Sequence, residues 1–300
     1  MLSPDHPSTL SSVLELFSDP SQTILIHDPW TTTLETSTRT TASSHEQSEY
    51  LASLRSIFLE GIERIRSKSF DQAAELFLMV LSGLQAESSQ GNGSDYSKRA
   101  RLLRALSLNN LGYVSQQKGE FDNAVIAFYD ALSNVMDPSD ARAHDTQAHP
   151  FVYTRLPEED LVLAILCCNA GRIHFIEGDY NEAEACLSRA ETVLLGRMHN
   201  VEGETKSPTN ALVECHLSAE FYLLRSVIRH TQVHVFLDIG DFRRGDETLP
   251  LVLGDISLFA CAATSPGQQD YYAHHNEFLG QCISCITTSV EEALSLHVFD

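Results

Sequence analysis

Small and aromatic residues recur at the same internal offsets in two stretches of this chain. Counted from Gly112, offsets of +7, +9, +12, +16 and +19 give Gly119, Phe121, Ala124, Phe128 and Ala131. Counted from Gly171, the same offsets give Gly178, Tyr180, Ala183, Leu187 and Ala190. Matches at this many positions are improbable by chance, so the chain is predicted to consist of repeated structural units.

Two further stretches keep part of the pattern. The earlier one retains Gly61, Phe70, Ala73 and Phe77, with a lysine at the +7 position. The later one starts from a valine and retains Gly240, Phe242 and Gly245. We therefore expect four repeats, of which the second and third are the most regular.

The spacing of apolar residues predicts that the repeats are helical. Steps of three and four place one face of a helix along Leu51, Leu54, Ile57, Phe58, Ile62 and Ile65. Two antiparallel helices cross closely where side chains are small, so Gly112 is expected to meet Ala124, and Gly171 to meet Ala183. Gly119 and Gly178 are expected to end the first helix in a left-handed cap, with the aromatic residue at +9 packed beside the turn.

Together, Leu111, Gly112, Ala124 and Phe128 resemble the tetratricopeptide-repeat signature L-G…A-x-x-x-F. The resemblance implies an all-α fold, a right-handed α-solenoid of antiparallel helix pairs. The glycines at 112 and 171 lie 59 positions apart, whereas a standard repeat has about 34 residues. Long inter-repeat loops are therefore expected.

The chain is expected to divide into an arm and a repeat domain. Residues 1–45 include ten Ser or Thr among the fourteen positions 31–44 and are predicted to be a mostly disordered N-terminal arm. Residues 46–300 are predicted to form the repeat domain. Its units are expected at about 50–86, 101–136, 160–197 and 210–257, with a capping helix over 270–297.

Two short apolar clusters interrupt the polar arm, at residues 13–17 and 24–26. One interpretation is a strand or turn packed on the end of the solenoid. The other is a recognition motif or a self-inhibiting peptide.

The resemblance also implies which side chains of each first helix face the concave groove, since these lie at fixed offsets from the crossing glycine. The candidate partner-binding residues are Asn109, Asn110, Tyr113, Gln116, Asn169, Arg172, Phe175, His230 and His234. Asn110 and Asn169 occupy the same position, where one amide can clamp a peptide backbone through a donor and an acceptor. A hydrogen bond between helices is the alternative role.

The groove lacks cations at the positions that tetratricopeptide-repeat proteins use to grip a C-terminal carboxylate, so binding of chaperone tails is not expected. Residues 105–195 are also loosely similar to the repeats of kinesin light chains, which share an asparagine–leucine pair in the first helix. This likeness implies nothing about cargo.

Forty-one acidic and 20 basic residues give a formal net charge of −21. Nucleic acid and anionic membranes are therefore disfavoured as partners, whereas a neutral or basic protein fits. The acidic surface is equally explained by solubility. No apolar stretch has the roughly 20 residues needed to span a bilayer, and neither a signal nor a transit peptide is evident, which favours an intracellular location.

His230 and His234 have the i, i+4 spacing of paired metal ligands, but the glutamate of H-E-x-x-H is absent. Cys282 and Cys285 lack a second pair, and the seven cysteines are expected to be reduced thiols. Nucleophile-elbow, phosphate-loop and dinucleotide motifs are also missing. We expect no metal, no cofactor and no enzymatic activity.

The sequence therefore predicts a scaffold or adaptor that binds a partner peptide or protein in the concave groove. The alternatives are a structural subunit or assembly factor of a larger complex and, less favoured, an enzyme on a helical-repeat scaffold. Partner identity and oligomeric state are not specified by the sequence.

Overall fold

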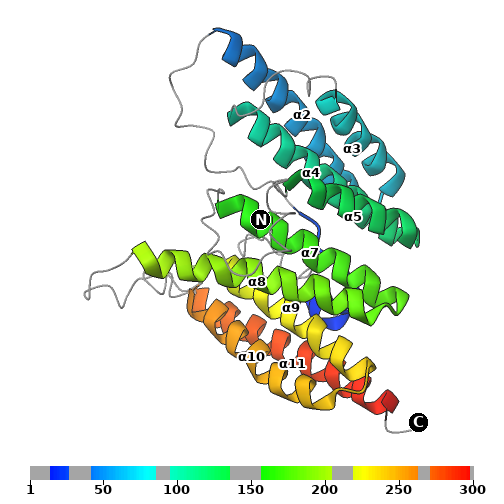
Figure 1. Cartoon of the computed structure of the whole chain (residues 1–300), viewed down its shortest axis with the longest axis vertical. Helices are drawn as coiled ribbons and strands as arrows, with labels where there is room; N and C mark the ends of the chain where they lie inside the picture. Colours follow the sequence, from blue (N-terminus) through cyan, green and yellow to red (C-terminus); the bar gives the residue numbers. More distant parts are fainter. Residues whose placement is uncertain are drawn as a thin grey trace, which may run out of the picture. The chain divides into compact units, whose positions relative to one another are not determined.

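A computed structural model describes residues 14–26, 42–85, 95–135, 157–204, 219–262 and 271–297. Every regular element in these ranges is a helix, and consecutive helices pair (Figure 1). The first pair is α2 (Ala42–Arg66) with α3 (Phe70–Gln85), and the second is α4 (Asp95–Gln117) with α5 (Phe121–Val135). The third is α7 (Pro157–Glu177) with α8 (Tyr180–Glu204), and the fourth is α9 (Ala219–Asp238) with α10 (Phe242–Ala262). The prediction of an all-helical repeat fold is confirmed.

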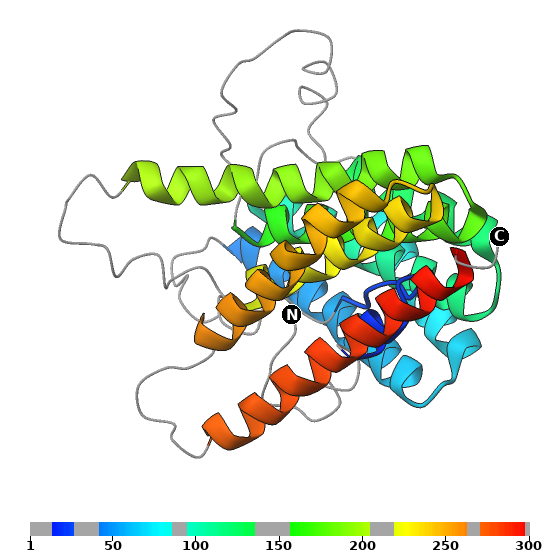
Figure 2. The same cartoon turned by 90° about the horizontal axis from the view of Figure 1, so that it is seen from below.

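The chain divides into two compact units, each described here by itself. The first compact unit comprises Leu25–Leu166 and the second comprises Leu2–Ile24 with Cys167–Asp300. In the first, α2, α3 and α4 pack on one another and α5 packs on α4. In the second, α9 packs on α8 and α10, and α11 (Tyr271–His297) lies against both α9 and α10 (Figure 2). The boundary between the two compact units falls within α7.

All four helix pairs turn in the same way. The residue at +7 has a positive φ in each repeat, 59° at Lys68, 76° at Gly119, 78° at Gly178 and 76° at Gly240. The next residue donates its N–H to the carbonyl of the residue five positions before it, as in Glu120 N to Ser115 O at 2.8 Å and Asp179 N to His174 O at 2.9 Å. This is the Schellman motif, and the predicted left-handed caps are present.

The crossing glycines are covered by a different residue from the one expected. A Cβ added to Gly112 would lie 2.8 Å from the ring of Phe128, and one added to Gly61 would lie 2.7 Å from Phe77. At Gly171, the nearest atom belongs to Leu187, with the backbone oxygen of Ala183 at 3.1 Å. The large +16 residue therefore fills the space above the glycine, while the +12 alanine lets the second helix come close enough for that contact.

The aromatic residue at +9 contributes less to packing beside the turn than expected. Phe121 is 36% exposed and Phe242 is 46% exposed, because the first residue of the second helix lies at the surface. Tyr180 is half-buried, with its ring centroid 6.2 Å from that of Phe175. In the fourth repeat, the small residue lies on the second helix, where Gly245 faces Leu237.

Residues 14–26 of the N-terminal arm have a defined conformation. Residues 14–18 form a helical turn, residues 19–21 bend, and residues 22–26 have no regular secondary structure. The N–H of Asp19 bonds to Glu15 O and that of Gln22 to Asp19 O, which keeps the bend compact. These thirteen residues are thus ordered within an arm that was expected to be mostly disordered, and α2 already begins at Ala42. Within the described part of the chain, no helix is long and apolar enough to cross a bilayer.

Candidate partner-binding site

In the first compact unit, the side chain of Asn110 bonds to both backbone groups of one arm residue. Its Oδ1 accepts the N–H of Ile26 at 3.1 Å, and its Nδ2 donates to the carbonyl of Ile26 at 2.9 Å. Asn109 donates from Nδ2 to the same Oδ1 at 3.1 Å, which fixes the orientation of the Asn110 amide. Both asparagines are fully buried on α4.

In the second compact unit, Asn169 makes the equivalent pair of bonds. Its Oδ1 accepts the N–H of Ile24 at 2.7 Å, and its Nδ2 donates to the carbonyl of Ile24 at 2.9 Å. Asn169 lies on α7 at the position that Asn110 occupies on α4. Each asparagine therefore clamps one residue of an extended backbone, the role considered from the sequence, and the clamped segment belongs to the chain itself.

Arg172, one turn further along α7, binds the arm through its guanidinium. Nη2 donates to the carbonyl of Leu16 at 3.3 Å, Nη1 donates to the carbonyl of Gln22, and Nε donates to Thr231 Oγ1 of α9 at 3.0 Å. The side chain is completely buried, which lowers the pKa of the guanidinium, while Cys168 and Asp19 act in the opposite direction. Its positive charge faces the carbonyl end of the arm's helical turn, where a cation is favourable.

Two histidines of α9 complete this surface. The ring of Phe17 meets His230 edge to face, with centroids 5.5 Å apart. His230 Nε2 lies 2.9 Å from Ser289 Oγ of α11 and 3.3 Å from His234 Nε2. Burial lowers the pKa of His230 and brings that of His234 down to about 4, in both cases assisted by the positive charge of Arg172. Both imidazoles are therefore neutral near pH 7.

The arm buries its apolar side chains along this surface. Leu16, Phe17, Thr23, Ile24 and Ile26 are each at most 4% exposed, whereas Glu15, Ser18 and Asp19 face solvent. The two short apolar clusters singled out in the sequence are thus the parts of the arm that dock. The interpretation of a packed turn and the interpretation of a self-inhibiting peptide are both compatible with this contact.

The remaining candidate residues differ in burial and in their neighbours. Gln116 is buried on α4, and Tyr113 is half-buried. Phe175 is half-buried between the rings of Tyr180 and His234, with centroids 6.2 and 6.5 Å away. The structure brings Asn169, Arg172 and His230 together around the arm in the second compact unit, and Asn109 and Asn110 in the first.

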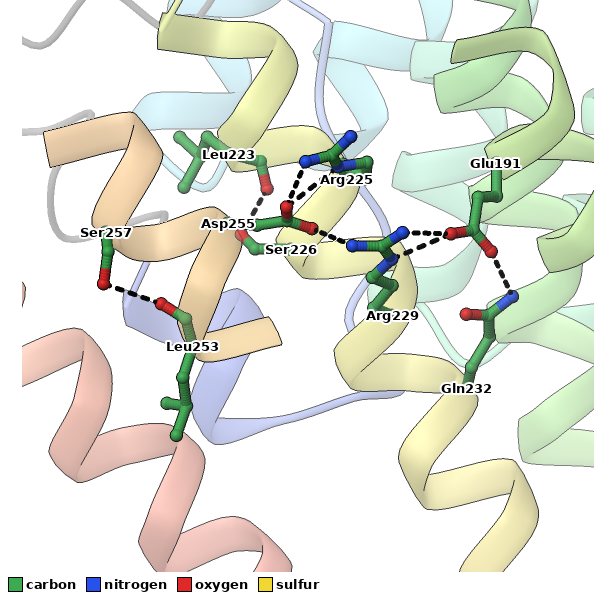
Figure 3. A network of polar contacts seen from close by, with 9 residues as sticks. All are labelled: Glu191, Leu223, Arg225, Ser226, Arg229, Gln232, Leu253, Asp255 and Ser257. Carbon is green, nitrogen blue, oxygen red and sulfur yellow. Dashed lines mark hydrogen bonds and ion pairs between the residues drawn. The ribbon is translucent and has the colours of Figure 1, made fainter. Parts of the chain in front are cut away.

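A buried polar network holds α9 in place and was not anticipated from the sequence (Figure 3). Asp255 of α10, 2% exposed, accepts from Arg225 Nε at 2.9 Å and from Arg229 Nη1 at 2.8 Å. Arg229 also donates to Glu191 of α8 at 2.7–2.8 Å, and Gln232 donates to the same carboxylate at 3.4 Å. One α9 face is thereby tied to α8 and α10. The signal was a pair of arginines four residues apart in an apolar helix.

The described residues contain no group of three or more His, Cys, Asp or Glu side chains placed to hold a metal ion. Cys167, Cys168, Cys186, Cys282 and Cys285 are free thiols, and burial raises the pKa of Cys167 and of Cys282 to about 12. These two thiols are therefore protonated and unreactive near neutral pH.

Comparison with known families finds tetratricopeptide repeats at residues 105–134 and 164–193. These ranges contain the two most regular copies of the glycine pattern, and each spans the end of a first helix, its Schellman turn and a second helix. No curated protein and no solved structure matched the chain. The helix pairs, the repeated turns and the family match together show that residues 105–134 and 164–193 are tetratricopeptide repeats.

Proposed function

We propose that the chain is a scaffold or adaptor that holds an extended segment of a partner protein on Asn110 and Asn169. Tetratricopeptide repeats generally serve protein–protein interaction, and this role is supported by the two matched repeats. The observation that carries the finer proposal is that each asparagine binds both the N–H and the carbonyl of one backbone residue. Such bonds recognise any extended polypeptide, whatever its side chains.

The backbone groups that the two asparagines bind belong to alternate residues of the arm. Ile24 and Ile26 are two residues apart, and in an extended chain residues i and i+2 direct their backbone groups to the same side. Each asparagine, in its own compact unit, would bind the N–H and the carbonyl of one such residue of a partner segment.

The side chains beside the clamps favour a neutral or acidic segment. The charged group at the clamp of the second compact unit is the cation Arg172, and the arm that it binds contains Glu15 and Asp19 but no basic residue between positions 14 and 26. A basic partner, suggested by the net charge of −21, would contact the acidic exterior instead.

The proposal is tested by truncating both clamps in the full-length chain. Partners captured by the immobilised wild type are identified by mass spectrometry, and one is then purified and titrated against Asn110→Ala/Asn169→Ala. We expect its affinity to fall by roughly 10- to 100-fold, because a clamp loss of about 1–3 kcal/mol is typical of unpaired polar groups. Asn123→Ala is the matched control, since Asn123 is exposed on α5, where its side-chain amide donates to Glu120 Oε2 at 3.2 Å.

Circular dichroism establishes that the double variant keeps its helices. Undiminished affinity in a folded double variant would show that the partner does not use the asparagine clamps.

A further inference from the structure

The arm satisfies the polar groups of the candidate site as a bound peptide would. In the second compact unit, Asn169 is engaged by Ile24, and Arg172 by the carbonyls of Leu16 and Gln22. In the first compact unit, Asn110 is engaged by Ile26. A partner segment cannot use these donors and acceptors while residues 14–26 hold them.

The contacts are of two kinds, and both define a ligand. Side chains of the repeats bind the arm through its main chain, which requires an exposed extended or turning backbone rather than a finished helix. Apolar arm side chains supply the rest, with Phe17 fully buried against His230, and Leu16 and Ile24 at most 4% exposed. The solvent-facing positions of the arm are polar, at Glu15, Ser18 and Asp19.

The arm also lies outside the repeats in the sequence. Residues 27–41 separate it from α2, and its bonds reach residues 84 to 156 positions later in the chain. It contributes no helix to a repeat pair. Its removal from the site therefore breaks none of the helix-to-helix contacts that define the four pairs.

We propose that residues 14–24 are an internal ligand of the site formed by Asn169, Arg172 and His230 in the second compact unit, and that the partner presents a segment of the same chemistry, which must displace them. That segment has an apolar–aromatic pair in a short turn, a bend, and an extended aliphatic stretch, with no positive charge facing Arg172. This inference rests on the proposed function, since it specifies the ligand and the regulation of the same clamps.

Tethering gives the arm an advantage over a free segment of equal intrinsic affinity. A ligand that belongs to the same chain as its binding site can reach an effective concentration in the millimolar range, so an external segment must exceed that level or bind more tightly. In the wild-type chain, the arm should therefore outcompete weak ligands, whereas a partner that also contacts other parts of the protein can displace it. Weakening the arm should make the clamps available.

The test uses a fluorescein-labelled peptide with the sequence of residues 13–27, titrated by fluorescence anisotropy into the full-length chain. The arm-weakened variant is Phe17→Ser/Ile24→Ser, which removes two buried apolar side chains from the arm alone. We expect it to bind the peptide at least tenfold more tightly than wild type does. Glu15→Gln is the matched control at an exposed arm position and should behave as wild type.

Adding Asn169→Ala to the arm-weakened variant should lower peptide affinity by about tenfold or more, because one clamp is then absent. A peptide that itself carries the two serine substitutions should not bind. Equal peptide affinity for wild type and a folded arm-weakened variant would overturn the inference.

Hydrogen exchange on the wild-type chain provides an independent decision, in case the double serine variant does not fold. An internal ligand can dissociate while the repeat helices stay folded. The amides of residues 24 and 26 should therefore exchange at least tenfold faster than the amides in the middle of α9. Exchange of the arm and α9 at one common rate would mean that the arm is a permanent part of the core, and the inference would be wrong.

The two proposals fail in different ways. If a captured partner depends on Asn110 and Asn169 but the arm peptide never binds, the site is a partner site and the arm is not its ligand. If the arm peptide binds but the captured partner ignores the asparagines, the clamps serve the arm and the proposed scaffold function fails.

Discussion

The two compact units bury different kinds of polar group. In the first, the buried polar side chains that the structure describes are hydroxyls and amides, such as Ser107, Asn109 and Asn110. The second buries ionisable groups as well, and these are Arg172, Arg225, His230, His234 and Asp255. The first compact unit should therefore respond mainly to changes of shape, and the second also to changes of charge.

The same contrast appears at the clamps. Asn110 and Asn169 are equivalent in the repeat, but the residue three positions later is Tyr113 in one case and Arg172 in the other. The repeat thus provides the backbone clamp, whereas the residue beside it determines what else the ligand must offer. At Asn169, that addition is the buried cation Arg172, which donates to two carbonyl groups of the arm and to the Thr231 hydroxyl.

The largest effect is expected from Asp255→Asn in the second compact unit. The substitution leaves the buried guanidinium of Arg225 without its anion, and removing one partner of a buried ion pair costs about 3–5 kcal/mol. Urea denaturation followed by circular dichroism measures the loss. The control is Arg243→Gln, which removes an ion pair whose side chains are 86% and 61% exposed and should change stability by less than about 1 kcal/mol.

If Asp255→Asn were as mild as the control, buried charge would not distinguish the second compact unit.

A change of shape should destabilise the first compact unit. In Gly112→Leu the new side chain would enter the space of the Phe128 ring, and overpacking of this kind costs about 1–3 kcal/mol. Gly254→Leu is the matched control, because no atom lies within 4 Å of a Cβ at that helical position. Thermal melting should separate the two variants. An unchanged melting temperature in Gly112→Leu would contradict the close crossing of α4 and α5.

The sequence predicted the helix pairs of both compact units, but not the difference between their buried polar groups. The glycine offsets predicted the pairs, the turns and the two asparagine positions, because these depend on residues close together in the chain. The identity of the bound segment did not follow, since Ile24 and Asn169 are 145 residues apart and no local pattern links them. The Asp255 network was likewise missed, because its acid and its arginines lie on different helices.

The pH dependence of stability should be confined to the charged region. The pKa of His234 is about 4 in the folded chain against its usual 6.5, because it is buried and lies near the positive charge of Arg172, while Asp19 partly compensates. Protonation therefore favours the unfolded chain. The stability that depends on a neutral His234 is fully present above pH 6.5 and is lost as the pH falls from 6.5 to about 4. Between pH 7 and pH 5, the free energy of unfolding should fall by roughly 2 kcal/mol.

His234→Gln should remove this part of the pH dependence. Urea denaturation of wild type and of His234→Gln is measured at pH 7 and pH 5. For each protein, the free energy of unfolding at pH 5 is compared with its own value at pH 7. Equal losses of stability in wild type and His234→Gln would show that this imidazole is not the titrating group.

The smallest effect concerns a feature that both compact units share. Lys68 has a φ of 59° where the other three repeats have glycine. A non-glycine residue in this region costs about 1 kcal/mol, so Lys68→Gly should stabilise the chain and Gly178→Ala should destabilise it by a similar amount. Differential scanning calorimetry can measure both. Shifts of the same sign in the two variants would mean that the turns are not equivalent.

The docked arm has a consequence for the order of events during synthesis. The arginine that binds Leu16 is made 156 residues after it, and the asparagine that binds Ile24 is made 145 residues after it. At roughly 5–20 residues per second, the nascent arm waits on the order of ten seconds for its binding site. Throughout that interval, Leu16, Phe17 and Ile24 are available to chaperones, and the burial of Phe17 against His230 marks the point at which α9 of the fourth pair has been made.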